Sequence, residues 1–210
     1  MANVDRANGF TPVGTFSGAP WQGSVQRFDL DATHAIIGVG DLVQMTSDGY
    51  PDIYAASEIS LLGVVVGVNT WQGNAVAGKV GDNFLSNTEP SLTGYAHNAV
   101  AHNTAGVIYV CTAPDVIMEA QEDAISASIA LADRGANIEI INTGSGPNTT
   151  TGISTMELNS DTVAQTATLP LKLLDLVQRP DNVLGATGSP GARWLVTPTV
   201  THYYRAALGL

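Results

Sequence analysis

Residues 73–80, GNAVAGKV, come nearest to a catalytic motif in this chain. Their first seven positions match the G-x-x-x-x-G-K pattern of loops that hold phosphate groups with backbone amides and a lysine. The pattern also requires Ser or Thr at the next position, where the hydroxyl binds Mg²⁺, and a helix that begins there. Val80 occupies that position, and residues 80–90 are not typical of a helix. We therefore expect an ordinary loop and no nucleotide cofactor.

The histidines do not predict a metal site. His97 and His102 are five positions apart, which places them on opposite faces of a strand and about 140° apart around a helix. His34 and His202 stand alone in the sequence. Structural zinc sites combine cysteines and histidines, and this chain has one cysteine. The sequence therefore predicts no bound metal.

Carboxylates gather at two places, Asp29 with Asp31, and Glu119 with Glu122 and Asp123. The first two share one face of an expected strand, but a glycosidase pair also needs a fixed separation between carboxyl groups. The second group lacks the ligand spacing of an EF-hand calcium loop. We prefer the interpretation that these charges keep strand edges solvated and prevent aggregation. With no G-x-S-x-G motif either, we expect a protein that is not an enzyme and has no catalytic, cofactor-binding or metal-ligating residues.

Composition and charge indicate an assembly subunit. Charged residues make up 13% of the chain and hydrophobic residues 44%, whereas charged residues are roughly a quarter of an average soluble domain. Such a surface favours burial against neighbouring subunits, although an uncharged polar surface is the alternative. The net charge of −11 repels phosphate backbones and anionic lipids. We expect neither nucleic acid nor a membrane as partner.

Cys111 is the only cysteine and lies in an apolar run, so we expect a buried thiol and no internal disulfide. Asp5 and Arg6 interrupt the start of the chain, which is not typical of a signal peptide. The longest apolar run, residues 61–68, is too short to cross a bilayer. Synthesis and folding in a reducing cytoplasm are the expectation.

The elements that would position these residues are short strands. Runs rich in Val, Ile and Leu alternate with Gly, Pro and Asp turns, and glycines inside the runs are typical of bulges in curved sheets. The expected strands start near Gln26 and include residues 36–45, 59–68, 107–112, 116–120, 138–141, 154–158, 166–177 and 193–203. Without a long amphipathic helix, this pattern predicts an all-β fold of jelly-roll-like sandwich or small barrel units.

Two segments are ambiguous. Residues 123–134 alternate like a strand, but Asp123 and Gly135 are typical of the ends of a short helix; we favour a strand with a helical turn at its end. Pro170 predicts an edge strand or a bulge, because proline lacks the N–H for a sheet hydrogen bond. We expect one β domain over residues 25–123, and a second β domain or a continuation of the same sandwich over 124–210.

Residues 1–24 contain Asn, Gly, Pro and Thr with scattered aromatic residues and no periodicity. Pro12 and Pro20 favour extended conformations in the residues before them. A disordered tail seldom contains aromatic residues, so we expect an extended N-terminal arm that buries Phe10, Phe16 and Trp21 on a partner. The alternative is a first strand packed on its own domain.

Residues 149–182 contain T-G-x-S-x-M-E-L, T-x-x-L-x-L and V-x-R-P-D-N in that order. These motifs, with residues 1–21 and 107–123, resemble a family of small structural proteins of tailed bacteriophages, the capsid cement or decoration proteins. The resemblance implies a structural virion protein that binds the major capsid protein on the outer capsid surface and stabilises contacts between its subunits. It also implies a homotrimer at three-fold positions.

Under this interpretation the interface residues are Phe10, Phe16, Trp21, Tyr203 and Tyr204, because rigid aromatic side chains suit interfaces. Deleting residues 1–22 would then leave a folded protein that no longer reinforces shells. The alternative function is a receptor- or carbohydrate-binding β-sandwich module of a phage tail or fibre. Exposed aromatic residues such as Trp71 and Tyr95, in expected loops, would support that alternative.

Overall fold

The computed structural model describes residues 3–30, 37–56, 61–70, 106–142, 147–148 and 152–201. The phosphate-loop-like stretch at 73–80, the four histidines, Asp31, Trp71, Tyr95, Tyr203 and Tyr204 lie outside these residues. The predictions made for them therefore stay predictions. Within the described residues the chain forms strands and one 3-10 helix, η2 (Leu131–Asp133).

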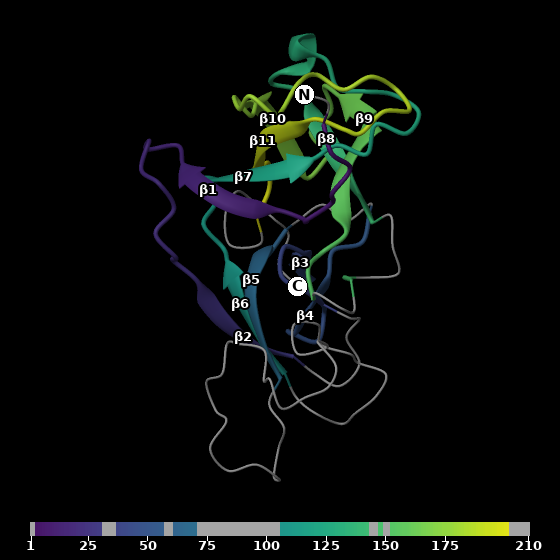
Figure 1. Ribbon diagram of the computed structural model, residues 1–210. Helices are drawn as coiled ribbons and strands as arrows, with labels where there is room; N and C mark the ends of the chain where they lie inside the picture. The colour runs from purple at the N-terminus through teal and green to yellow at the C-terminus, as the bar shows by residue number, and fades with distance from the viewer. Residues whose placement is uncertain are drawn as a thin grey trace.

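The strands form two antiparallel sheets (Figure 1). The six-stranded sheet, in the upper part of the figure, has the order β1 (Thr11–Thr15), β7 (Val116–Gln121), β11 (Arg193–Pro198), β10 (Leu171–Leu176), β8 (Asn137–Asn142) and β9 (Met156–Ala164). The five-stranded sheet, below it, has the order β2 (Gln26–Leu30), β6 (Gly106–Cys111), β5 (Gly63–Thr70), β3 (Leu42–Met45) and β4 (Pro51–Ile53). The chain begins in the first sheet, builds the second, and returns to the first at β7.

Alternating side chains explain the strands that pack most closely. In β7 Val116, Met118 and Ala120 are buried while Ile117 and Glu119 are less so. This period of two places one face of the strand on the core. The predicted glycine bulge is confirmed at Gly67, where the register between β5 and β6 shifts by one residue.

Two clusters of buried side chains make the core. The larger one joins the sheets: Trp194 and Met118 of the six-stranded sheet lie in it together with Leu42, Val64 and Cys111 of the five-stranded sheet. The smaller one belongs to the five-stranded sheet and includes Val65 and Ile108. The two packed antiparallel sheets confirm the all-β sandwich prediction.

The six-stranded sheet also curls toward itself. Glu122, just after β7, forms a parallel bridge with Leu158 of β9, and the Asp123 N–H donates to the Leu158 carbonyl at 3.0 Å. Glu122 and Asp123, which follow β7, thus cover part of the outer edge of β9. An edge covered in this way is protected from pairing with another chain.

The first 24 residues differ from the extended arm that the sequence suggested. Residues Thr11–Thr15 form β1, which pairs with β7, and Phe10 is 1% exposed. The alternative expectation, a first strand packed on its own domain, describes this segment. The expected boundary at residue 123 also shifts, because β7 already belongs to the sheet that contains the C-terminal strands.

Two local predictions were wrong. Residues 122–130 form no extended strand, and only the helical turn η2 appears at the end of the segment. The alternation of apolar and small residues in this segment indicated a strand. The N–H of Ile129 instead donates to the Glu122 carboxylate and not to a neighbouring strand. Pro170 precedes β10, which lies between β11 and β8 and is not an edge strand, and the register shift of β10 falls between Leu173 and Asp175 and not at Pro170. A proline just before a strand removes no hydrogen bond from the sheet.

Candidate interaction surface

The three carboxylates at the end of β7, Glu119, Glu122 and Asp123, have different partners in the fold. Glu119 pairs with two arginines, Arg179 and Arg193. Glu122 is fully buried, and Asp123 accepts a hydrogen bond from the Ser160 hydroxyl at 2.5 Å. Across the described residues, no group of three or more His, Cys, Asp or Glu side chains is placed to hold a metal ion. These carboxylates act as hydrogen-bond acceptors for the fold.

Glu122 connects three segments. Its carboxylate oxygens accept hydrogen bonds from the N–H groups of Ile129 at 2.6 Å and Ala192 at 2.9 Å. Burial raises the pKa of Glu122, while these two N–H groups and the Trp194 side chain act in the opposite direction. Because it holds the irregular segment and the start of β11 against β7, we assign Glu122 a positioning role within the fold.

Asp41 is the second buried carboxylate and lies where the two sheets meet. One of its oxygens accepts a hydrogen bond from the Gly38 N–H at 2.7 Å, and the Ser154 side chain is near enough to favour the charged form. The other oxygen has no hydrogen-bond partner in the described part of the chain. Burial raises the pKa of Asp41 from 3.8 to about 6, while the Ser154 side chain and the Gly38 N–H act in the opposite direction.

Glycines allow three segments to cross beside Asp41. The Phe10 N–H donates to the Gly40 carbonyl at 2.9 Å, and a Cβ at Gly9 would lie 2.4 Å from the Ser154 Cβ. Gly9 and Gly40 have φ angles of 64° and 91°, which side chains disfavour. This close crossing fixes the point at which the N-terminal segment enters the six-stranded sheet.

Side-chain amides then hold the residues before the crossing. Asn3 accepts from the Val183 N–H at 2.9 Å and donates to its carbonyl at 2.8 Å. Gln121 donates to the Val4 carbonyl at 3.0 Å and accepts from the Arg6 N–H at 3.1 Å. The N-terminal segment is therefore tied to the sheet along its length.

The V-x-R-P-D-N motif also has a structural explanation. The Asn182 side chain donates to the Val177 and Arg193 carbonyls at 2.8 and 2.9 Å and accepts from the Arg193 N–H at 2.8 Å. It thereby joins the loop after β10 to the residue that follows β10 and to the first residue of β11. Arg179 of the same motif reaches Glu119 on β7. The sequence pattern thus marks a turn that these bonds stabilise.

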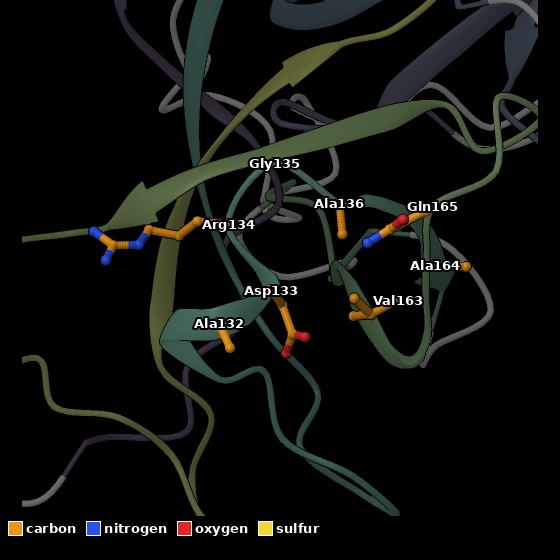
Figure 2. Close-up of a pocket in the computed structure, with 8 residues that line it drawn as sticks. All are labelled: Ala132, Asp133, Arg134, Gly135, Ala136, Val163, Ala164 and Gln165. Atoms are coloured by element: carbon orange, nitrogen blue, oxygen red, sulfur yellow. The ribbon is translucent and has the colours of Figure 1, made fainter.

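One surface hollow of about 370 Å³ lies between η2 and the end of β9 (Figure 2). Asp133 and Arg134 line it, and their side chains extend in different directions. Both are already engaged: Asp133 accepts from the Ala130 N–H at 2.8 Å, and Arg134 pairs with Asp175 at 3.1 Å. A catalytic site would need polar groups that converge on a substrate, and these charged groups do not.

A different surface has the character of a contact site. No Asp, Glu, Lys or Arg occurs between Arg6 and Arg27. Within this stretch Phe16 is 58% exposed, Val13 40% and Val25 38%. We call residues 11–26 the neutral strip. In Figure 1 its β1–β2 connection runs along the outside of the molecule from one sheet to the other.

Hydrogen bonds order the part of the neutral strip that carries Phe16. The Thr15 N–H donates to the Ala19 carbonyl and the Gly18 N–H to the Thr15 carbonyl, both at 3.0 Å. The Phe16 N–H donates to the Asp115 carbonyl at 3.1 Å. Gly18 has a φ of 82°, the left-handed conformation that closes such turns. Phe16 is therefore an exposed aromatic residue on a fixed turn.

The structure separates the predicted interface residues. Phe10 is buried in its own chain and is not available to a partner. Trp21 is half-buried and packs on the larger core cluster. Phe16 is exposed, and its contact with a partner stays a prediction. Val13 and Val25 are also exposed and were not predicted; the signal that could have found them is the lack of charged residues between Arg6 and Arg27.

No helix in the described ranges is long and apolar enough to span a membrane. Comparison with known proteins identifies no relative: no family model, no curated protein and no solved structure matches this chain.

Proposed function

We propose that this chain is a capsid cement or decoration protein of a tailed bacteriophage. It is a structural, non-enzymatic protein that binds the major capsid protein on the outer capsid surface and stabilises contacts between shell subunits. The observation that carries the proposal is the neutral strip, an exposed segment without charged residues on a two-sheet body, in a chain whose net charge is −11. The sequence resemblance to phage cement proteins names the partner.

The proposed stabilisation of the shell depends on a body of constant shape and on contacts that are repeated by symmetry. A body that keeps its form presents the same surface to each shell subunit, and a homotrimer at three-fold positions repeats each contact by symmetry. Linked contacts add avidity, so no single one has to be strong. The hydrogen bonds of Asn182, Gln121 and Glu122 support such a body, because they fix turns and the N-terminal segment to the strands.

The charge favours the outer surface of the shell. A net charge of −11 opposes contact with packaged nucleic acid, whose phosphates carry the same sign. On the outside, this charge keeps unbound trimers soluble and separate from one another.

Quantitative protein staining of purified particles, with light scattering of the isolated chain, tests the proposal. We expect a copy number near that of the major capsid protein and a trimeric mass in solution. A few copies per particle would favour a receptor- or carbohydrate-binding tail module. A monomer absent from particles would refute both functions.

A further inference from the structure

Residues 38–41 form a turn to which three segments of the chain are bonded. The Gly40 N–H donates to the Val65 carbonyl of β5 at 2.8 Å, and the Gly40 carbonyl accepts from the Phe10 N–H at 2.9 Å. The same turn is bonded to residues 152–154, which lead into β9. It therefore connects the N-terminal segment, the five-stranded sheet and the six-stranded sheet.

Asp41 closes this turn with a carboxylate that has little compensation for its burial. One oxygen accepts from the Gly38 N–H at 2.7 Å, whereas the other is buried without a hydrogen-bond partner among the described residues. Asp41 itself is 1% exposed. The described segments packed against it contain no titratable or charged side chain; they are residues 8–10, 38–40, 64–65 and 152–154. Ionisation of Asp41 therefore opposes this packing, because the charge has neither water nor a counter-ion.

The N-terminal segment, residues 3–15, is the one of these three that separates most easily. β5 lies inside its sheet, between β6 and β3, and residues 152–154 make two bonds to Val39, at 3.0 and 2.8 Å. Residues 3–15 end in β1, a short edge strand whose register with β7 shifts between Pro12 and Gly14. Short edge strands open at a lower free energy than inner strands do.

Other ionisable groups near the N-terminal segment are exposed or bonded elsewhere. Asp5 and Arg6 are exposed. Glu122, whose pKa burial also raises, accepts its hydrogen bonds from the N–H groups of Ile129 and Ala192, which lie outside the segment. The carboxylate at the crossing itself is thus the group that can couple the position of the segment to pH.

We propose that Asp41 is a pH-sensitive latch for the N-terminal segment. The protonated side chain keeps residues 3–15 docked on the turn and on β7. The ionised side chain favours separation of the segment, because water then reaches the carboxylate. This device belongs to the fold and does not depend on the proposed function.

The direction of the response follows from the proton. The docked form keeps a proton that the open form has lost, since burial raises the pKa of Asp41 from 3.8 to about 6. Docking is therefore firmest below about pH 4 and weakens as the pH rises through about 6.

Hydrogen exchange followed by mass spectrometry between pH 4.5 and 8 tests the latch, with each rate divided by that of the unfolded chain at the same pH. The normalised rate of residues 3–15 should rise by at least about tenfold between pH 4.5 and 7.5. At pH 7.5 it should exceed that of residues 106–111 in β6. Asp41→Asn should abolish the rise, whereas Asp161→Asn, at an exposed position of β9, is the matched control and should behave like the wild type.

Three results would overturn the latch. The first is a normalised rate of residues 3–15 that does not change with pH, and the second is an unchanged rise in Asp41→Asn. The third is an equal rate for residues 3–15 and 106–111 at pH 7.5, because the molecule would then open as a whole. If Asp41→Asn does not fold, Ser154→Ala replaces it. It removes a group that favours the charged form, so the rise should level off at a higher pH, and an unchanged profile would contradict the proposal.

Discussion

Asp41 has a buried carboxylate at the junction of the two sheets, and the described segments around it carry no charge. The segments packed against it, residues 8–10, 38–40, 64–65 and 152–154, contain no titratable side chain. The groups that favour its charged form are the Ser154 side chain and the Gly38 N–H. Burial outweighs both and raises its pKa to about 6. The charged form is therefore costly in the folded protein.

The sign of the pH effect follows from the two pKa values. The folded-state pKa of about 6 exceeds the ordinary value of 3.8, so the folded protein keeps a proton that the unfolded chain has lost. The contribution of Asp41 to stability is fully present below about pH 4 and is lost as the pH rises through about 6. Above that pH the buried charge lowers the free energy of unfolding by about 2–3 kcal/mol.

Asp41→Asn should remove this penalty, because the amide oxygen can still accept from Gly38 and carries no charge. We expect the free energy of unfolding to rise by about 2 kcal/mol at pH 7.5 and to change little at pH 4. Urea denaturation at both pH values measures this. Asp161→Asn, at an exposed position of β9, is the control and should give no such difference. A variant less stable than wild type at pH 7.5 would contradict the account.

Among the elements, strands with local sequence signals could be predicted from the sequence. The interval expected at 107–112 is observed at Gly106–Cys111, and that at 138–141 is observed at Asn137–Asn142. Runs of β-branched residues between turn residues are sufficient to mark such strands.

The N-terminal element could not be predicted in this way, because its partner is distant in the sequence. Residues Thr11–Thr15 become a strand through pairing with Val116–Glu119, and nothing local indicates this. The register shifts between Pro12 and Gly14, which offsets the alternation of side chains along the segment. Phe10 and Phe16 therefore have opposite environments, although both look like anchors in the sequence.

The two phenylalanines provide a matched pair for testing this element. Phe10→Ala removes a ring that is 1% exposed and should lower the free energy of unfolding by about 3–4 kcal/mol. Phe16→Ala removes a ring that is 58% exposed and should change it by less than about 0.5 kcal/mol. Urea denaturation of both variants gives the comparison.

Equal, small effects would restore the free-arm interpretation of residues 1–24. The expectation that deleting residues 1–22 leaves a folded protein is withdrawn, because this segment packs on its own domain. The deletion removes β1, the Phe10 ring and the hydrogen bonds of Asn3 to Val183.

At the scale of the whole molecule, the two sheets share one core and one chain path. The larger cluster contains Cys111 and Val64 from the five-stranded sheet beside Trp194 and Met118 from the six-stranded sheet. The chain crosses between the sheets after β1 and again before β7. Opening either sheet would expose apolar surface of the other, so we expect them to unfold in one cooperative transition.

Two buried side chains can report on the sheets separately. Cys111 is the only thiol, and its labelling follows the opening of β6 in the five-stranded sheet. With Trp21 and Trp71 replaced by Phe, the fluorescence of Trp194 follows the six-stranded sheet. We expect both signals to change at the same urea concentration.

Val110→Ala sharpens the test, because Val110 is fully buried in the smaller cluster, which belongs to the five-stranded sheet. It should lower the free energy of unfolding by about 1–3 kcal/mol through the lost methyl groups and the cavity they leave. If the molecule is one cooperative body, the thiol and fluorescence midpoints will fall together. If only the thiol midpoint falls, the sheets are independent domains joined by two crossings. A contact made through the neutral strip would then hold the five-stranded sheet to the shell far less firmly than the proposed function requires.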